Sequence, residues 1–318
     1  MAQVVIGVGT SHSPQLSVRA SQWQLLREKD EKDPRLDYQG LLQRAKPNLA
    51  AELTPEKFRQ RHEACLKAVS TLGDALRHAN PDVVVVFGDD QQEQFHDDNM
   101  PTFAIYHGKS LPVVKDSGLK PARWKEAERM GWAETSDEYD TAQDLANHLI
   151  RSLVDDEFDI ARCNTLRPEV GVGHAFSFLY RRIVPGSKLP IVPVMVNTYY
   201  PPNQPTPKRC YAFGQAARKA IESWEGGKRV AVMASGGLSH VIIDEEIDHI
   251  VTGALRNKDR EALWRLPRDK LRGGTSEILN WVALAGVAEP MELQYLEYVT
   301  TYRSPAATGC GMGFAYWI

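Results

Sequence analysis

Three histidines lie in or at the end of turn sequences, and one glutamate precedes an apolar run. At these positions the four side chains could face a ligand. His12 stands in the sequence Gly-Thr-Ser-His-Ser-Pro, His240 ends Ser-Gly-Gly-Leu-Ser-His, and His174 ends Gly-Val-Gly-His. Glu277 directly precedes the apolar sequence Ile-Leu-Asn-Trp-Val. Imidazole and carboxylate ligands with open coordination positions are typical of Fe(II) sites that use O2, and the same groups bind Zn2+. The set therefore predicts a metal site and leaves the metal open.

Each of these residues, taken alone, also has a structural interpretation. A histidine in a loop commonly caps a neighbouring turn, and an acid in the first turn of a helix interacts favourably with the helix macrodipole. The prediction of a metal site therefore depends on His12, His174, His240 and Glu277 as a group.

The distribution of apolar residues predicts the elements that carry these side chains. Four short apolar runs predict buried strands, at 4–8, 83–87, 191–196 and 229–234. Apolar residues at helical spacing predict helices, at about 55–78, 140–153 and 208–224, with a further helix beginning near Thr275. Alternating strands and helices indicate an α/β fold. We expect a single-domain sandwich in which helices flank a central mixed sheet and loops at the strand ends form the site.

Two polar stretches interrupt this pattern. Residues at about 20–60 are charged and contain several prolines. The stretch at about 115–165 begins with a segment of charged and aromatic residues. No internal repeat or linker divides the sequence. We therefore expect one catalytic domain over residues 1–318, with insertions at about 20–60 and 115–165.

Bulk composition excludes several classes of partner. The 318 residues carry a net charge of only −3, so neither nucleic acid nor an anionic membrane is an expected partner. No apolar run is long enough to span a bilayer, and the N-terminal sequence lacks the basic flank and cleavage site of a signal peptide. The four cysteines are scattered, which argues against a disulfide framework. These features predict a cytoplasmic protein.

Six motifs together resemble those of the class III extradiol ring-cleavage dioxygenases. This superfamily contains the catalytic β-subunit of protocatechuate 4,5-dioxygenase and the gallate and 3-O-methylgallate dioxygenases. The motifs occur in the family's order between residue 5 and about residue 285. They are Gly-Thr-Ser-His-Ser-Pro at 9–14, the strand at 82–87 with Gly-Asp-Asp-Gln at 88–91, Gly-His at 173–174, Pro-Ile-Val-Pro-Val at 190–194, Ser-Gly-Gly-Leu-Ser-His at 235–240 and Glu-Ile-Leu-Asn-Trp at 277–281.

The resemblance implies an activity and a role for each residue. It implies cleavage of a catechol-type phenol, similar to protocatechuate, gallate or 3-O-methylgallate, with O2 at non-haem Fe(II). His12 and Glu277 correspond to metal ligands, His240 to the acid/base histidine, and His174 to a second active-site histidine that contacts substrate. Family habit also implies a homodimer. The two insertions could cover the site, so no separate small subunit is expected.

The chain departs from the family at the second metal-binding histidine. The protocatechuate enzyme has Asn-Asp-His after its central strand, where this chain has Gly-Asp-Asp-Gln at 88–91. Alignment on the downstream phenylalanine places Gln91 at the histidine position, whereas a gapless alignment places Asp90 there. Glu93 and His96 are close enough in sequence to substitute. We take Gln91 as the predicted third ligand, with the other three as alternatives.

Three further residues are candidates for binding the substrate. Tyr199 and Tyr200 precede a Pro-Pro pair and could wall an aromatic ring, although such a loop is equally a rigid surface turn. Arg303 could pair with a substrate carboxylate, and it could also be an ordinary surface arginine.

Two other functions are compatible with the same residues. A Zn-dependent hydrolase needs a similar set of histidine and carboxylate ligands and an open position for water. A non-catalytic scaffold protein on the same fold is favoured by the missing strand-end histidine.

Overall fold

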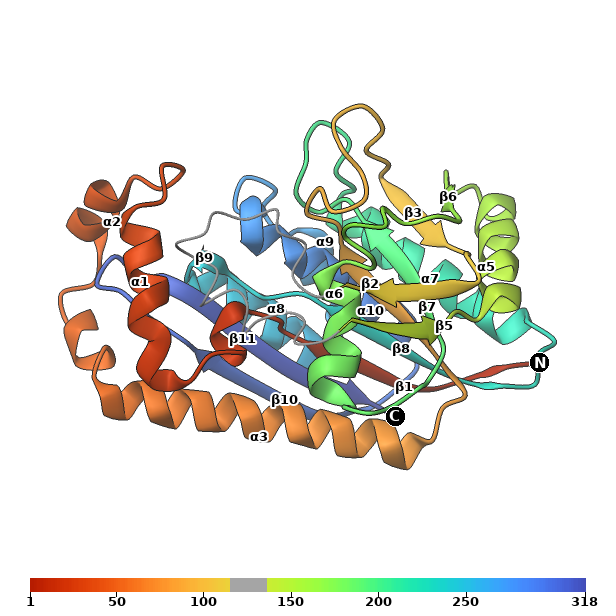
Figure 1. Cartoon of the computed structure of the whole chain (residues 1–318), viewed down its shortest axis with the longest axis horizontal. Coiled ribbons are helices and arrows are strands. Elements are labelled where there is room, and N and C mark those ends of the chain that lie inside the picture. Colours follow the sequence, from red (N-terminus) through yellow and green to blue (C-terminus); the bar gives the residue numbers. More distant parts are fainter. Residues whose placement is uncertain (115–135) are drawn as a thin grey trace.

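The computed structural model describes residues 1–114 and 136–318. Its central feature is one mixed sheet (Figure 1). In spatial order the sheet consists of β10 (Leu293–Thr300), β11 (Thr308–Trp317), β1 (Gln3–Thr10), β8 (Arg229–Ser235), β2 (Val83–Asp89), β7 (Ile191–Val196), β3 (Phe103–Tyr106) and β6 (Ala161–Cys163). The neighbours from β1 to β7 are parallel, while β11, β10 and β3 each join the sheet antiparallel.

Three shorter strands lie outside this order. β9 (His240–Ile242) pairs antiparallel with β11. β4 (Ser110–Val113) and β5 (Asp137–Asp140) form a separate two-stranded sheet. β9 matters for function because it begins at one of the candidate histidines.

Helices cover both faces of the sheet (Figure 1). The helices whose apolar residues join one core cluster are α5 (Gln143–Asp155), α7 (Pro207–Ser223), α8 (Glu245–Asn257), α9 (Arg260–Trp264) and α10 (Ile278–Ala288). The opposite cluster contains residues of α3 (Pro55–Ala79) and α6 (His174–Phe178). The predicted α/β sandwich around a mixed sheet is confirmed.

The central strand shows why the sheet is covered on both sides. Successive side chains of a strand point to opposite faces. In β2, Val83, Val85 and Phe87 join the core cluster of α7 and α10, whereas Val84 and Val86 join that of α3. All seven residues of β2 are buried. The uninterrupted apolar run thus marks a strand between two helical layers.

The two longest helices of the described residues begin with the same local signal. Thr54 precedes Pro55 and Thr206 precedes Pro207, and each threonine hydroxyl accepts a hydrogen bond from a backbone N–H of the first turn. Proline at the first helical position lacks an N–H that would have no partner there. These caps fix where α3 and α7 begin, within about a residue of the predicted positions.

Most predicted elements are confirmed, and several of their boundaries are shifted. β7 matches its prediction, while β2 and β8 extend further, to Asp89 and Ser235. The helix predicted from residue 140 begins at Gln143, because Asp137–Asp140 pairs with β4 as strand β5.

The insertion at about 20–60 folds into short helices, α1 (Trp23–Glu31) and α2 (Tyr38–Arg44), between two single turns. It has a small core of its own around Trp23 and Phe58. Of the predicted insertion at 115–165, residues 115–135 lie outside the described residues, and the remainder forms β5, α5 and β6. The boundaries of both insertions stay predictions.

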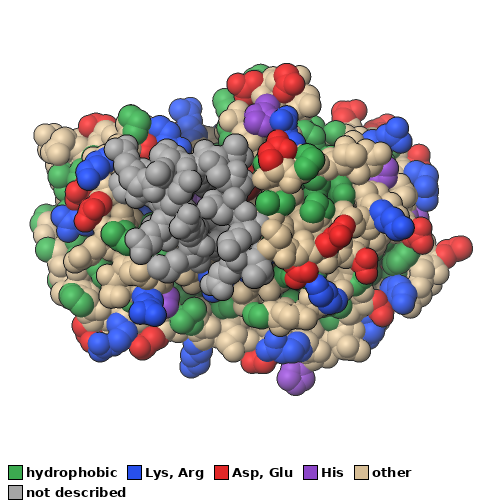
Figure 2. Space-filling view, viewed as in Figure 1, with side chains coloured by type: hydrophobic (Ala, Val, Ile, Leu, Met, Phe, Trp, Pro, Cys, Tyr) green, Lys and Arg blue, Asp and Glu red, His purple; other side chains and the backbone are tan. Residues whose placement is uncertain are grey.

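The surface shows no segregation of charge on the face drawn in Figure 2. Over the described part of that face, basic and acidic side chains are interspersed. Within residues 1–114 and 136–318, no helix combines the length and the hydrophobicity that crossing a membrane requires.

Candidate active site

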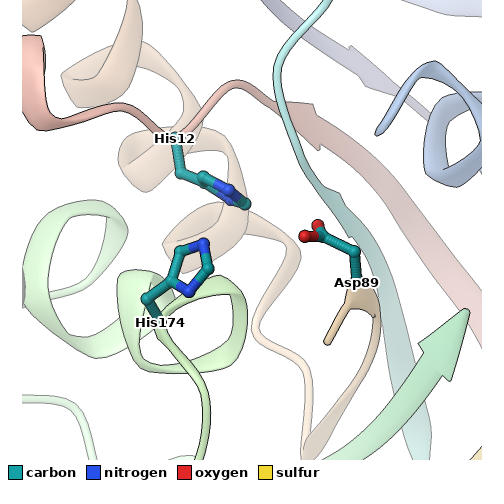
Figure 3. Close-up of side chains that lie close together, drawn as sticks. All are labelled: His12, Asp89 and His174. Carbon is teal, nitrogen blue, oxygen red and sulfur yellow. The ribbon is translucent and has the colours of Figure 1, made fainter. Parts of the chain in front are cut away.

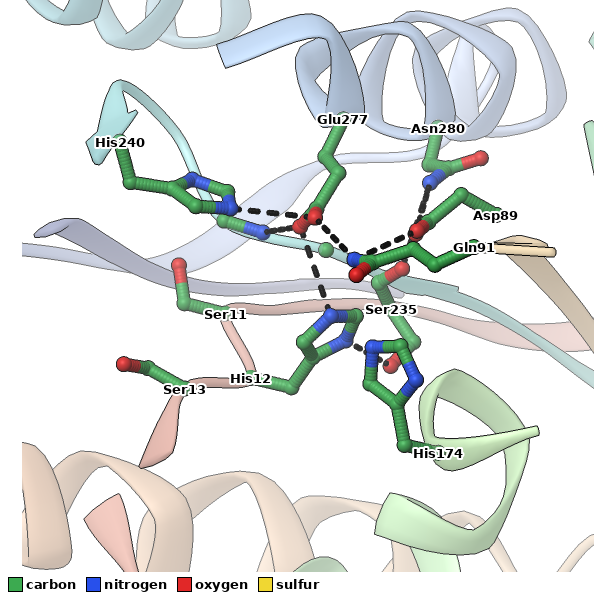
Figure 4. Close-up of polar contacts among 12 residues, drawn as sticks. Ser11, His12, Ser13, Asp89, Gln91, His174, Ser235, His240, Glu277 and Asn280 are labelled. Atoms are coloured by element: carbon green, nitrogen blue, oxygen red, sulfur yellow. Dashed lines mark hydrogen bonds and ion pairs between the residues drawn. The ribbon is translucent and has the colours of Figure 1, made fainter. Parts of the chain in front are cut away.

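The site lies where three adjacent parallel strands end. β1 and β2 both flank β8, and Thr10 and Gly88 each pair with Ser235. His12 follows β1 and Asp89 ends β2, so their side chains meet at this edge of the sheet (Figure 4). Ligand sites in open α/β sheets commonly occupy this position, outside the carboxyl ends of the strands.

The motifs at 235–240 and 277–281 are joined by direct hydrogen bonds at this edge of the sheet. The turn after β8 meets the first turn of α10 through three hydrogen bonds. The indole N–H of Trp281 donates to the Gly236 carbonyl (2.8 Å), and the Asn280 amide donates to the Ser235 carbonyl (3.3 Å). The backbone N–H of Gly237 donates to Oε2 of Glu277 (2.6 Å). These bonds bring Glu277 to the ends of the strands.

His12 is held so that one ring nitrogen faces Glu277. Nδ1 lies 3.0 Å from the hydroxyl of Ser235, and Nε2 lies 3.4 Å from Oε2 of Glu277. Only 4% of the residue is exposed. Burial lowers the pKa of His12 to about 3, against the opposing charge of Glu277. The ring is therefore neutral near pH 7, which is the form that binds a metal ion.

Glu277 is the hub of the site. Its side chain is fully buried, and its Oε1 accepts hydrogen bonds from Nε2 of His240 (3.0 Å) and from the hydroxyl of Tyr199 (2.8 Å). Burial alone would raise the pKa of Glu277, but the charge of His240, then His12, outweighs burial and lowers it to about 2. Glu277 is thus an ionised carboxylate in a setting shielded from water.

His240 is fixed in one orientation. Its Nδ1 donates to the carbonyl of Leu238 (2.8 Å), which leaves Nε2 to face Glu277. A Cβ at Gly274 would lie 2.2 Å from the ring, so only glycine allows the ring to sit there. Burial opposes protonation of His240, yet the charges of Glu277 and Cys310 hold its pKa well above the ordinary value. His240 therefore carries an exchangeable proton on Nε2.

His174 approaches from the opposite side. Its ring centroid lies 4.7 Å from that of His12, and its Nδ1 lies 2.8 Å from Oε1 of Glu93. A Cβ at Gly173 would come within 2.3 Å of the Glu93 carboxylate, which explains the glycine before the histidine. Burial disfavours the charged ring, but Glu93 outweighs it and raises the pKa of His174 to about 9. The other ring nitrogen, Nε2, points into the site (Figure 4).

The end of β2 and the loop after it supply two side chains to the site, Asp89 and Gln91, and turn one away. Gln91, the predicted third ligand, places Nε2 at 3.2 Å from each of Glu277 Oε1, Asp89 Oδ2 and the Tyr199 hydroxyl. Asp90 instead accepts hydrogen bonds from the backbone N–H groups of Gln94 and Phe95 (both 2.9 Å). Sequence reasoning did not single out Asp89, although it is the first charged residue after the apolar run of β2.

Asp89 joins the two histidines as a possible metal-binding group. One ligand atom from each of Asp89, His12 and His174 lies within 4.8 Å of the others, and the carboxylate points toward both rings (Figure 3). Burial, followed by the charge of Glu277, raises the pKa of Asp89 to about 8. Glu277 is not in that group, but its Oε2 lies 3.4 Å from Nε2 of His12, so two carboxylates and two imidazoles line this part of the site. This donor set fits a divalent ion such as Fe(II), Mn2+ or Zn2+.

The three predicted substrate-binding residues lie in two places. Tyr199 reaches the site through its bond to Glu277, and the ring of Tyr200 lies 5.9 Å from that of Tyr199. Arg303 is engaged elsewhere. Its guanidinium donates two bonds to Asp30 (2.6 and 2.9 Å) and a third to Gln15 (2.9 Å).

Comparison with known proteins identifies a family. The family described as the catalytic LigB subunit of aromatic ring-opening dioxygenase matches residues 46–313. A gallate dioxygenase from Pseudomonas putida is 36% identical over 104 residues, which is 32% of this chain and 29% of that protein.

Other relatives are named 2,3-dihydroxyphenylpropionate/2,3-dihydroxicinnamic acid 1,2-dioxygenase. The one from Azotobacter vinelandii is 27% identical over 161 residues, covering 51% of this chain and 44% of that protein. The one from Paraburkholderia xenovorans is 28% identical over 191 residues, covering 58% of this chain and 52% of that protein. The chain thus spans about half, or less, of the length of these curated relatives.

Proposed function

The chain belongs to the family of catalytic LigB subunits of aromatic ring-opening dioxygenases, and on this premise we propose that it is an extradiol dioxygenase. It would open the ring of a catechol-type phenol with O2 at non-haem Fe(II). The observation that carries this proposal is the convergence of His12, His240 and Glu277 on one buried point, with His240 on Oε1 and His12 beside Oε2.

We propose that His12 and Glu277 hold the iron. The end of β2 or the loop after it would supply the remaining protein ligand, for which Gln91 is the sequence-predicted residue. Its amide already lies 3.2 Å from Glu277 Oε1, and a half-turn would present the amide oxygen instead of the nitrogen. The chemistry that bound Fe(II) supplies is activation of O2 and acidification of the phenol.

His240 would act as the acid/base group. Because Leu238 holds Nδ1, proton exchange is confined to Nε2, the atom that faces the site. Nε2 would give its proton to the oxygen that departs as the ring opens, and the deprotonated nitrogen would then take a proton from a substrate hydroxyl. A histidine suits both steps because one ring nitrogen can both donate and accept a proton.

Two further residues would position the substrate. His174 presents Nε2 toward the site because Glu93 holds Nδ1, so it can hydrogen-bond a substrate oxygen. Tyr199, anchored on Glu277, and its neighbour Tyr200 would wall the aromatic ring. Arg303 is left out of this proposal, because Asp30 and Gln15 occupy its guanidinium.

O2 consumption by anaerobically Fe(II)-loaded protein tests the proposal. The substrates are protocatechuate, gallate, 3-O-methylgallate and catechol, with 2,3-dihydroxyphenylpropionate added because relatives carry that name. We expect uptake and a yellow product with at least one of them, and none with Zn2+-loaded protein. Activity with Zn2+ and no O2 uptake would instead indicate a hydrolase.

One observation favours a second candidate, a non-catalytic scaffold protein. The position of the family's second metal histidine carries no histidine here, since residues 88–91 are Gly-Asp-Asp-Gln. Protein that binds neither Fe(II) nor Zn2+ would support this alternative. The homodimer without a small subunit and the cytoplasmic location stay part of the proposal and can be checked by light scattering and cell fractionation.

A further inference from the structure

We propose that Asp89 is the metal ligand that takes the place of the family's second histidine, an inference that rests on the proposed function. Asp89 would complete the site with His12 and Glu277, and His174 would stand beside the ion. The group that Asp89 forms with His12 and His174 includes none of the acids or histidines that the sequence offered, namely Asp90, Glu93 and His96.

The position of Asp89 is the first support. It is the last residue of β2, directly beside the end of β8, and its carboxylate points at the rings of His12 and His174 (Figure 3). Ligand atoms of the three residues lie within 4.8 Å of one another, a separation that a single ion can bridge.

The charge of Asp89 is the second support. The side chain is 0% exposed, and its hydrogen-bond donors are two neutral amides, Gln91 (3.2 Å) and Asn280 (3.4 Å). Among the described residues, no lysine or arginine forms an ion pair with it. A carboxylate buried with neutral partners is costly, and a divalent cation would offset that cost.

Asp248 shows what a purely structural buried aspartate looks like in this protein. It is also 0% exposed, but three short hydrogen bonds satisfy it. They come from the backbone N–H of Ser239 (2.8 Å), the Ser239 hydroxyl (2.7 Å) and the Tyr298 hydroxyl (2.6 Å). Asp89 has fewer and longer bonds, and it faces imidazoles.

The other candidates are committed to different partners. Both carboxylate oxygens of Asp90 accept backbone N–H groups, and Oε1 of Glu93 holds His174. The nitrogen of Gln91 faces three oxygen acceptors, so this amide acts as a donor that separates the acids. Asp89, at the end of β2, is the carboxylate that lies with His12 and His174.

Metal binding tests this inference without requiring turnover. We would titrate metal-free protein with Co2+ and, anaerobically, with Fe(II), measuring affinity by calorimetry and coordination by the visible spectrum of Co2+. The variant is Asp89→Asn, which keeps the shape and removes the charge. Asp90→Asn, one residue along the same loop, is the matched control, and Glu277→Gln tests the proposed function.

Loss of a ligand should exceed the loss of an outer partner, which typically lowers affinity 10–100-fold. We expect Asp89→Asn to weaken Co2+ binding more than about 100-fold and to change the spectrum, with Asp90→Asn within about threefold of wild type. Circular dichroism would verify folding. If Asp89→Asn does not fold, Asp89→Glu keeps the carboxylate, and we expect it to bind Co2+ with a shifted spectrum.

The failures are distinguishable. Wild-type affinity and an unchanged spectrum in Asp89→Asn (or in Asp89→Glu, if that variant is the one used), with binding lost in Glu277→Gln, would overturn the role of Asp89 and leave the proposed metal site standing. Wild-type protein that binds neither metal would overturn the proposed function and this inference together.

Discussion

Two buried polar clusters in this protein differ in how their charges are matched. The first, which we call the N-terminal clasp, consists of Gln15, Asp30 and Arg303. It joins α1 to the turn after β10 through a two-bond ion pair (2.6 and 2.9 Å), and Gln15 also donates to the Thr301 carbonyl (3.0 Å). Every charge in the clasp faces its opposite.

The second cluster, at the strand ends, is not matched in this way. Asp89 and Glu277 are both fully buried, and they face imidazoles and amides rather than lysine or arginine side chains within the described residues. A matched buried pair holds two segments together, whereas acids that converge on imidazoles, without a lysine or arginine among the described residues, mark a place for a cation. We therefore infer that the N-terminal clasp stabilises the fold and that the cluster at the strand ends binds a metal ion.

The largest expected effect comes from removing the proposed acid/base group, His240, from the cluster at the strand ends. His240→Ala should lower turnover by about 10²–10⁴-fold, the usual contribution of a general acid/base group, because Nε2 is its one exchangeable position. Metal affinity should be preserved. His148→Ala is the control, since that histidine bonds Ala220 and Ser223 away from the site. Retained ring opening in His240→Ala would remove its assigned role.

Mutations in the N-terminal clasp should lower the stability of the protein without changing its turnover. Arg303→Met leaves the buried Asp30 without its partner and should lower the free energy of unfolding by about 3–5 kcal/mol in urea titrations. Turnover per folded molecule should not change. Asp30→Asn in the same chain should restore part of the stability. A selective rise in KM for carboxylated substrates would instead return Arg303 to the substrate site.

Asp89 should destabilise the metal-free protein as pH rises. Its pKa is about 8 in the folded chain against a usual 3.8, so its contribution to stability is present below about pH 4 and is lost as pH rises through about 8. Asp89→Asn does not titrate. Between about pH 4 and pH 8, the free energy of unfolding of Asp89→Asn should therefore rise relative to that of wild type. The rise should be at least about 1.4 kcal/mol, which corresponds to one pKa unit.

Urea titrations of metal-free protein at several pH values measure this difference. Asp90→Asn is the comparison, because Asp90 is bonded by the backbone and its pKa is raised less, to about 6. A stability gap that does not vary with pH would mean that Asp89 is not a buried acid in the folded protein.

The smallest expected effect is at the tyrosine beside Glu277. Tyr199→Phe removes one hydrogen bond to the carboxylate and keeps the ring that would wall the substrate. A net hydrogen bond contributes about 1 kcal/mol, so kcat/KM should fall by about fivefold in steady-state assays. Tyr200→Phe, whose ring is adjacent, should have less effect. A loss of metal binding in Tyr199→Phe would mean that the hydroxyl positions Glu277.

The sequence predicted the parts of the site that local signals define. The strands at β2, β7 and β8 are apolar runs bounded by turn residues, and His12 and His240 follow such runs directly. Side chains at the ends of adjacent parallel strands meet, which is why these two histidines come together with Glu277.

The sequence could not distinguish residues whose roles depend on direction or distance. Asp89 and Asp90 are neighbours, but one points into the site and the other binds its own loop, and no periodic pattern separates them. Arg303 and Asp30 pair across 273 positions, a contact that only the folded chain reveals. Asp140, the last residue of β5, was predicted to begin a helix because the partner strand β4 is distant in sequence.

Labelling with ¹⁸O2 tests the central claim most directly. Fe(II)-loaded protein would convert its best substrate under ¹⁸O2 in unlabelled water, and mass spectrometry would count the labels in the ring-opened product. The site proposed here predicts two oxygen atoms from O2, apart from exchange of an aldehyde oxygen with water. A product whose new oxygen comes from water alone would contradict the dioxygenase assignment and point to hydrolysis at the same metal.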